Sequence, residues 1–168
     1  IRTVGSESSS ANVDSHGSSV TDGIEQMGGS IQGRELSLST AVTTFAGSSS
    51  GYTDHATGTS ASFNNPYGIT TDGMNLYVTD TNNHRIRKIV IDNGTVTTLA
   101  GQSDNGSTDA TGTSASFNKP YGITTDGTNL YVADFGNHRI RKIVIDNGTV
   151  TTLAGSSQGS TDGTGTSA

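Results

Sequence analysis

The sequence contains no cysteine, only two prolines and two methionines, and no long apolar run. Without cysteine there is no disulfide framework, no thiolate nucleophile and no cysteine-ligated metal. No segment approaches the roughly 18 consecutive apolar residues of a membrane-spanning helix, so we expect no membrane span. Hydrophobic residues make up only 29% of the chain and charged residues only 14%, and serine, threonine, asparagine and glycine fill the deficit. This composition favours many short strands and turns over one thick core.

Acidic residues outnumber basic ones, 15 to 9, which gives a formal net charge of −6. Binding to nucleic-acid phosphates requires clustered lysine and arginine, so we expect no nucleic-acid partner. The basic residues that do cluster lie in two identical stretches, residues 84–88 and 138–142. One interpretation of these stretches is an RNA or anion contact. The other, which the acidic balance favours, is a set of structural arginines paired with acids such as Asp80 and Asp134.

The chain consists largely of tandem copies of one sequence unit. Residues 42–95 align without a gap on residues 96–149, with 41 of 54 positions identical, and a third copy begins at Val150. Fixed periods of this kind are typical of propellers, solenoids and other repeat arrays. Within the unaligned residues 1–41, short matches to the repeat leave two alternatives open. This segment is either a decayed, shortened repeat or a serine- and glycine-rich linker that leads into one hairpin.

Each repeat predicts four short strands, which in the first copy span residues 67–72, 76–80, 84–91 and 95–100. Asp72-Gly73 marks the first turn. Asn93-Gly94 between two apolar runs predicts a two-residue type I′ hairpin turn, in which both central residues have positive φ. In the third strand Ile86 and Val90 share one face while Ile89 and Ile91 share the other. Because both faces carry apolar groups, we expect neighbouring sheets to cover both sides, as in stacked blades.

The fold class that follows is all-β, with four-stranded antiparallel blades that are too few to close a ring. We divide the chain into four parts. Residues 1–41 are a serine- and glycine-rich segment or a decayed blade that ends in a hairpin strand, and residues 42–101 are the first blade with a preceding outer strand and loop. Residues 102–155 are the second blade, and residues 156–168 are the start of a third repeat. The stacked-sheet arrangement is that of a β-propeller.

Three short motifs resemble the signature of the NHL-repeat family. They are Pro66–Ile69, Tyr77–Asp80 and Asn83–Ile86, and each recurs at the equivalent place in the second copy. The resemblance implies a four-stranded propeller blade, usually six to a closed ring. It also implies a binding platform, since most NHL domains serve as one and a minority are lyases.

Two or three blades cannot close such a ring, and the end blades would expose unpaired faces and edges. We therefore expect the chain to assemble with other copies of itself, through blade stacking and strand exchange, into a ring or a filament. The alternative is that the chain is a fragment of a longer NHL propeller that acts as a protein- or ligand-binding platform or as a lyase. On the assembly hypothesis we expect residues 1–33 to lie against a neighbouring chain.

We expect no catalysis, no cofactor and no metal site. The histidines His16, His55, His84 and His138 do not follow the spacing of zinc ligands. The acids Asp54, Asp104, Asp109 and Asp162 lie in loops without the spacing of a calcium site, and turn residues are the better interpretation. No nucleophile motif arranges the serines.

The two copies differ mainly in their loops, which is where a specific ligand would bind. The candidate binding residues are Tyr52, His55, Asn65, Lys119 and Phe135. The residues assigned to the structural motif are Asp80, His84, Arg85, Asp134, His138 and Arg139. The alternative for the loops is drift after duplication. The expected partners are other copies of the chain and a protein or glycan ligand, and the expected location is extracellular or on the cell surface.

Overall fold

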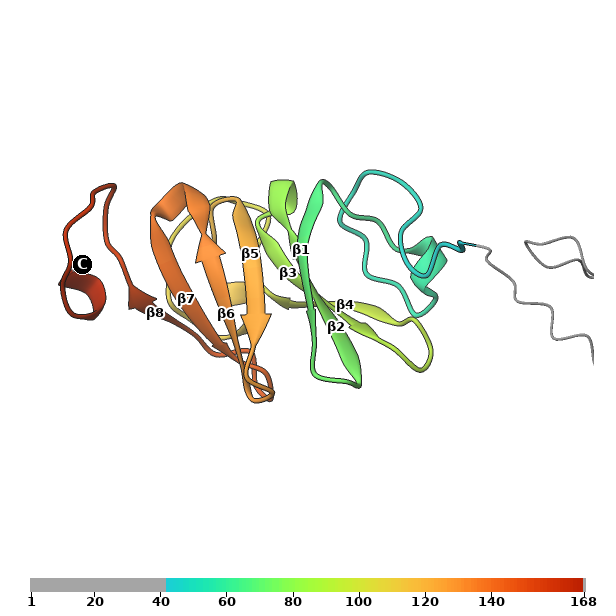
Figure 1. Ribbon diagram of the computed structural model, residues 1–168. Coiled ribbons are helices and arrows are strands. Elements are labelled where there is room, and N and C mark those ends of the chain that lie inside the picture. Colours follow the sequence, from blue (N-terminus) through green and yellow to red (C-terminus); the bar gives the residue numbers. More distant parts are fainter. Residues whose placement is uncertain (1–41, 168) are drawn as a thin grey trace, which may run out of the picture. The chain divides into compact units, whose positions relative to one another are not determined.

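A computed structural model describes residues 42–167, so the predictions made for residues 1–33 and 1–41 lie outside the described residues. Two four-stranded antiparallel sheets follow one another along the chain (Figure 1). The first blade contains β1 (Pro66–Thr71), β2 (Asn75–Asp80), β3 (Arg85–Val90) and β4 (Val96–Ala100). The second contains β5 (Pro120–Thr125), β6 (Asn129–Asp134), β7 (Arg139–Val144) and β8 (Val150–Ala154). The fold is therefore all-β, with two propeller-type blades and no closed ring in the described part.

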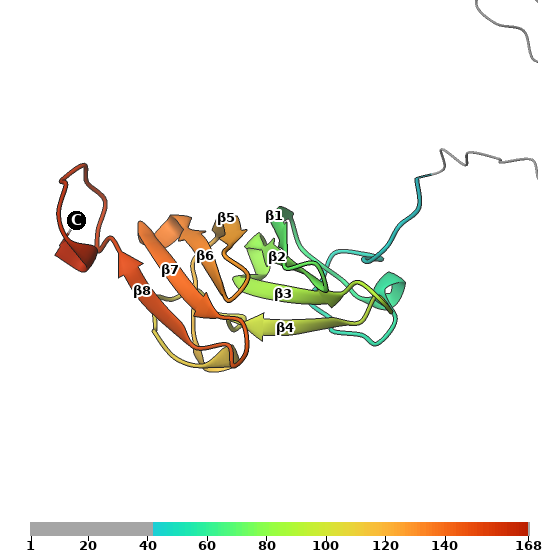
Figure 2. The same cartoon turned by 60° about the horizontal axis from the view of Figure 1, so that its bottom comes forward.

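In each blade the strands pair in the order in which they occur along the chain. Figure 2 shows β1 and β5 next to each other, with β4 and β8 on the far side of their sheets. Single 3-10 turns connect the elements: η1 (Gly58–Ser60), η2 (Thr81–Asn83), η3 (Gly112–Ser114), η4 (Phe135–Asn137) and η5 (Gly165–Ser167). These three-residue turns are the helices of residues 42–167, and none is long enough to cross a membrane.

The strand bounds agree with the predicted ones to within one residue, but the predicted type I′ hairpin turn is wrong. The connection from β3 to β4 is longer than two residues, and Gly94 N–H donates to Val90 O at 2.8 Å. Of the two turn residues only Gly94 has a positive φ, of 73°. Asn93 instead accepts a hydrogen bond from Thr95 N–H through its Oδ1, at 2.9 Å. The side chain of Asn93 thus caps the loop, and its backbone does not need the left-handed conformation.

A buried arginine holds each blade to the connection that precedes it. Arg87, on β3, is fully buried and bonds Asp80 at 2.7 Å and Asp54 at 2.6 Å. Its guanidinium also lies over the Phe63 ring, 4.8 Å from the centroid. Arg141 of the second blade makes the corresponding ion pairs with Asp134 and Asp109. A buried charge is tolerated when it is paired and hydrogen-bonded on several sides, as these guanidiniums are.

These ion pairs correct the gapless alignment of the two copies. Asp54 and Asp109 have the same role in their blades, whereas the gapless alignment places Asp54 opposite Thr108. The connecting loop therefore contains a one-residue shift, and its motif is Gly-x-Thr-Asp at residues 51–54 and 106–109. Several loop differences between the copies come from this shift. The same motif recurs at 159–162, which makes Asp162 the third member of the set.

Candidate functional site

The joint between the two blades is the most completely built contact surface of the described residues. Strands β1 and β5 lie side by side there, and two threonines of the first blade bond the backbone of β5. Thr79 Oγ1 donates to Tyr121 O at 2.7 Å and accepts from Gly68 N–H at 2.7 Å. Thr81 Oγ1 donates to Pro120 O at 2.7 Å. The joint therefore has fixed polar contacts that set how one blade sits on the next.

The rest of the joint is apolar. The first blade contributes Tyr77, Ile86 and Ala100, and the second contributes a matching set that includes Leu130 and Ile143. All five side chains are fully buried in one continuous cluster. Packing of this kind supplies most of the stabilisation in stacked sheets.

Gly68 permits the blades to approach this closely. A Cβ added there would lie 2.5 Å from Tyr121 O and 3.2 Å from Ile123 Cγ2. Its counterpart Gly122 faces away from the joint, and a Cβ there would meet only the Ala133 Cβ, at 3.7 Å. Glycine is thus required at position 68, inside the joint, whereas position 122 on the open face has room for a Cβ.

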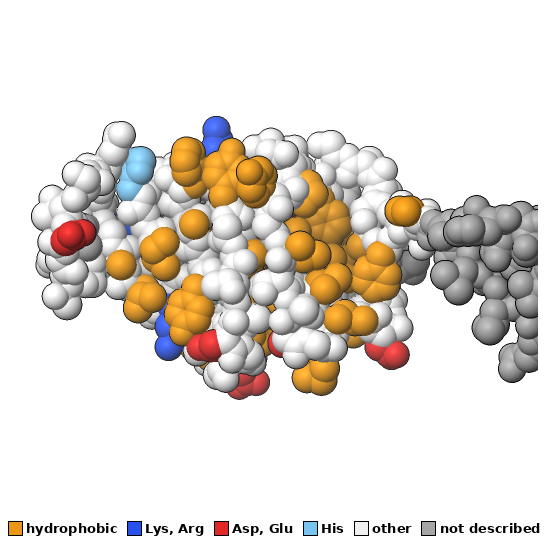
Figure 3. Space-filling view, viewed as in Figure 1, with side chains coloured by type: hydrophobic (Ala, Val, Ile, Leu, Met, Phe, Trp, Pro, Cys, Tyr) orange, Lys and Arg blue, Asp and Glu red, His pale blue; other side chains and the backbone are white. Residues whose placement is uncertain are grey.

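Each blade has one face that the neighbouring blade does not cover. The open face of the first blade contains Phe63, Ile69, Leu76 and Val78, and it forms a mainly apolar groove of about 370 Å³. Figure 3 shows hydrophobic side chains gathered over this sheet and the adjoining loop. Ile69 is 61% exposed, whereas its counterpart in the joint, Ile123, is half-buried.

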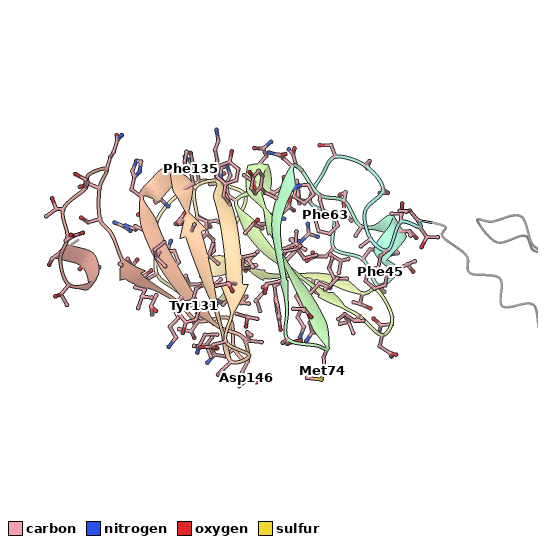
Figure 4. All side chains as sticks on the ribbon, viewed as in Figure 1. Phe45, Phe63, Met74, Tyr131, Phe135 and Asp146 are labelled. Atoms are coloured by element: carbon pink, nitrogen blue, oxygen red, sulfur yellow. The ribbon has the colours of Figure 1, made fainter. Side chains whose placement is uncertain are left out.

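The open face of the second blade contains Tyr131, Ala133, Phe135 and Ile140, and it surrounds a hollow of about 300 Å³ near Phe135 and Ile140. Ile140 is 41% exposed although its counterpart Ile86 is fully buried in the joint. Figure 4 places Phe135 at one end of this blade, while Phe45 and Phe63 lie beside the first blade. The two open faces are therefore the two halves of the joint, displayed at opposite ends of the described unit.

The second open face differs from its counterpart in the joint at two decisive positions. Ala133 replaces Thr79 and Phe135 replaces Thr81, so the hydroxyl groups that bond β5 are absent from this face. In their place Phe135, 59% exposed, packs edge-on against Tyr121 with the ring centroids 5.0 Å apart. Tyr121 in turn packs against Tyr67 at 4.6 Å, so three rings form a row along one end of the blades.

The candidate binding residues are not brought together into one site. The Arg85 guanidinium lies over the ring of Tyr52, 4.6 Å from the centroid, and His55 pairs through its backbone with Val96. Asn65 and Lys119 occupy equivalent left-handed positions, with φ of 57° and 51°. A protein or glycan ligand on these loops therefore stays a prediction from the sequence.

Lys119 and His84 meet across the joint. Lys119 N–H donates to His84 Nδ1 at 3.1 Å. Burial, together with the nearby charge of Lys119, lowers the pKa of His84 below its usual value. The contact thus requires the neutral imidazole, because a protonated Nδ1 cannot accept a hydrogen bond.

The residues assigned to the structural motif have different roles. Asp80 and Asp134 accept hydrogen bonds from the buried arginines and from the backbone N–H of Asn64 and Asn118. His84 and His138 both have φ of 56° and end the short 3-10 turns. Arg85 and Arg139 bond loop carbonyls at 3.4 and 3.1 Å and do not pair with Asp80 or Asp134.

As the sequence predicted, Asp80 and Asp134 pair with arginines of the two basic stretches, and the arginines that pair are Arg87 and Arg141. Sequence reasoning missed their second partners, Asp54 and Asp109. Burial alone would raise the pKa of Asp109, but hydrogen bonds from Thr152 and Arg141 lower it below its usual value. The recurrence of Gly-x-Thr-Asp was the signal that could have identified these aspartates as structural. Within residues 42–167 no three histidine, aspartate or glutamate side chains converge.

Comparison with known proteins agrees with this geometry. The NHL repeat family model matches residues 63–89 and 117–143, one segment in each blade. The chain is 38% identical over 92 residues to NHL repeat-containing protein 2 of Gallus gallus, and 38% over 101 residues to the protein of that name in Homo sapiens. These matches cover 54% and 57% of the chain but only 12% and 14% of the relatives, so the chain spans about an eighth of their length.

A solved structure of a Bacteroides thetaiotaomicron protein of unknown function is similar at 33% identity, with a TM-score of 0.51. The match covers 64% of this chain and 27% of that one.

Proposed function

We propose that the chain, which contains one NHL repeat in each of its two blades, is a non-catalytic structural and binding module that stacks on further copies of itself. The observation that carries this proposal is the match between its two open faces. The open face of the second blade corresponds to the half of the joint that contains Ile86, and the open face of the first blade corresponds to the half that contains Leu130.

A head-to-tail contact between copies repeats the joint with a shift of one blade along the chain. The Phe135 side chain of one copy then lies against Pro66 of the next, beside Tyr67, as Thr81 lies against Pro120 within the chain. Tyr67 is 70% exposed in the single chain, and Phe135 is also exposed. The contact removes this apolar surface from water, which is the dominant driving force for association.

The contact uses different surfaces on the two copies, so it either closes a ring or continues as a filament. Three chains with two blades each would supply the six blades that are usual in the family. A filament results if the rotation between copies does not close. The outline of the assembly in negative-stain images distinguishes these two forms.

The test of the proposal is the mass of the chain in solution as a function of concentration, together with one blocking variant. Sedimentation velocity of the wild-type chain is expected to show assemblies that grow with concentration. In Gly122→Ala the new Cβ fits within its own chain. In a contact between copies it would meet Tyr67 O of the next copy, just as a Cβ at Gly68 would lie 2.5 Å from Tyr121 O within the chain. This variant is expected to fold normally and to remain monomeric.

Thr128→Ala, in the exposed turn between β5 and β6, is the matched control and should assemble like the wild type. A wild-type chain that is folded and monomeric at all concentrations would refute self-assembly. That outcome would favour the second candidate, in which these blades stack on other repeats of one longer polypeptide. The chain would then contribute part of a binding platform.

The proposal includes an extracellular or cell-surface location. Support comes from the serine-, threonine- and asparagine-rich composition and from three exposed Asn-Gly-Thr or Asn-Gly-Ser sites, at Asn93, Asn105 and Asn147. Such sites become acceptors for glycosylation when they lie on the surface of a secreted protein. Antibody labelling of intact cells compared with permeabilised cells tests the location, and a signal that appears only after permeabilisation would contradict it.

A further inference from the structure

Residues 42–47 have the position of an outer strand that belongs to a preceding blade. Their sequence, VTTFAG, repeats as VTTLAG at 96–101 and 150–155, where it forms β4 and β8. Each of the three segments leads into the same kind of loop, called the corner below, which spans residues 47–58, 101–112 and 155–165. The N–H groups of Gly47, Gly101 and Gly155 donate to the carbonyls of Gly58, Gly112 and Gly165, at 3.0, 3.2 and 3.2 Å.

The packing of this segment agrees with that position. Ala46 contacts the apolar cluster on the open face of the first blade, as Ala100 contacts the cluster of the second blade. Phe45 lines the groove on the same face. Among residues 42–167 no strand pairs with residues 42–47, and Val42 is 99% exposed. Within the described residues, the segment therefore has the place of a fourth strand but not its strand partner.

This position creates a conflict when two copies stack in the register of the joint. The second blade of one copy brings its own β8 and the following corner, residues 150–167, to the open face of the first blade of the next copy. Residues 42–59 of that next copy already lie there. Residues 150–167 of one copy and residues 42–59 of the next would therefore occupy the same space, so one of these segments has to be displaced.

The anchoring of the two segments decides which one leaves. The corner after residue 47 is fastened to its own blade by Asp54, which bonds Arg87 at 2.6 Å. Asn83 Nδ2 adds a bond to Gly51 O, also at 2.6 Å. In contrast, the backbone hydrogen bonds found for residues 155–167 stay within that segment. To replace residues 47–59, the incoming copy would have to break the bond between the buried Arg87 and the half-exposed Asp54, so its own residues 155–167 give way. β8 leads directly into that segment, and it gives up its pairing with β7 and its bonds to Asp109 to the incoming strand.

We propose that copies of this chain join by strand exchange, in which residues 42–46 of one copy form the fourth strand of the second blade of its neighbour, beside β7. The displaced strand is β8 of that neighbour. The inference rests on the proposed self-assembly and specifies its mechanism. Each copy gives a strand at one end and receives one at the other.

The incoming strand has the side chains that the site requires. Val42 corresponds to Val150, which is 1% exposed in the second blade. Thr44 corresponds to Thr152, whose N–H and Oγ1 both bond Asp109. The new strand can therefore replace both the apolar contact and the hydrogen bonds of β8. The exchange itself is close to neutral, and stacking of the blades provides the net stabilisation.

Disulfide trapping tests the exchange without interference, because the chain has no cysteine of its own. Lys142 lies opposite Thr151 in the β7–β8 pair, and Thr43 is the counterpart of Thr151 in the incoming strand. Directly paired residues of neighbouring strands are close enough for a disulfide. A chain with Thr43→Cys and Lys142→Cys is therefore expected to form covalent multimers on oxidation. The start of the described chain and strand β7 lie at opposite ends of the described unit (Figure 1), so the link forms between copies.

The matched variant, Lys142→Cys with Thr151→Cys, locks β8 onto β7 within one chain. Loss of free thiols confirms that the disulfide has formed on oxidation. The oxidised variant is expected to stay monomeric, and its reduction is expected to restore assembly to the wild-type level. If the locked chain assembles as well as its reduced form, β8 does not leave and the exchange is wrong, although stacking stands. Assembly without covalent multimers in the first variant has the same meaning. If the wild-type chain does not assemble at all, the proposed function fails together with the exchange.

Discussion

Gly68 and Gly122 offer a measurement of the joint between the blades that cancels most other effects. Both lie in the sequence Pro-Tyr-Gly-Ile-Thr-Thr, at the same place in β1 and β5. Replacement of glycine by alanine reduces the conformational freedom of the unfolded chain equally at both sites, by about 0.4–1 kcal/mol. Any difference between Gly68→Ala and Gly122→Ala therefore comes from the neighbours that the new methyl group meets.

Those neighbours differ sharply. At position 68 the Cβ would lie 2.5 Å from Tyr121 O and 3.2 Å from Thr79 Oγ1, and both atoms belong to the polar contacts of the joint. At position 122 the nearest atom is the Ala133 Cβ at 3.7 Å, which is an ordinary contact. Overpacking of this kind costs about 1–3 kcal/mol. We therefore expect Gly68→Ala to be less stable than Gly122→Ala by roughly that amount.

The assay is urea unfolding followed by circular dichroism, at a protein concentration where sedimentation shows only monomers. The monomer condition matters because Gly122→Ala is also expected to block assembly, and assembly would add stability to the other proteins. Equal unfolding free energies for the two variants would refute the reasoning. The blades would then not be joined in solution as β1 and β5 are joined in the structure.

Three further predictions test other parts of the structure. Ala133→Thr restores to the open face the hydroxyl that Thr79 has in the joint, so the copies should associate more tightly, about fivefold for one added hydrogen bond, as measured by sedimentation equilibrium. Asp80→Ala leaves the buried Arg87 without one of its two carboxylates and should cost about 3 kcal/mol in urea unfolding, more than Asp54→Ala, because Asp54 is partly exposed. The pKa of His84 is lowered in the folded chain, so its contribution to stability should be present above its unfolded pKa of about 6.5 and be lost as the pH falls below that value. Melting temperatures of wild type and His84→Gln measured from pH 8 to pH 5 should converge as the pH falls, and parallel curves would contradict this prediction.

The sequence predicted the strands well because two signals agree at each of them. Alternating apolar residues mark the strands, and glycine or asparagine marks the turns between them. The turn at Asn93-Gly94 was the exception. The same dipeptide serves a two-residue loop and a longer one, and only the register of β3 against β4 decides which forms.

The arginine network was harder to assign because the arginine that lies opposite Asp80 in the strand register is not the one that forms the ion pair. Arg85 lies directly opposite Asp80 in the β2–β3 pair, yet Arg87 makes the ion pair. The guanidinium of Arg87 reaches Asp80 inside the blade, whereas Arg85 lies over Tyr52 in the preceding loop. The register of β2 against β3 could be predicted from the sequence, but which of the two arginine side chains is buried inside the blade could not.

Burial at the joint could not be derived from the repeats at all. The stretch His-Arg-Ile-Arg-Lys is identical in both blades, but Ile86 is fully buried and Ile140 is 41% exposed. The difference arises from the neighbouring blade and not from the strand itself. A near-perfect repeat predicts equal environments, so the positions where the environments differ identify the surfaces available for contact.

The substitutions at those surfaces indicate which joint is the weaker one. Within the chain, Thr79 and Thr81 bond two carbonyls of the next strand. In a contact between copies the corresponding carbonyls are those of Pro66 and Tyr67, and they meet Ala133 and Phe135, which have no donor. Burial of a carbonyl without a partner costs about 1–3 kcal/mol, and the added apolar contact of Phe135 offsets part of this cost. The joint within the chain should therefore persist when the copies separate, so assembly would be reversible by dilution while each pair of blades stays intact.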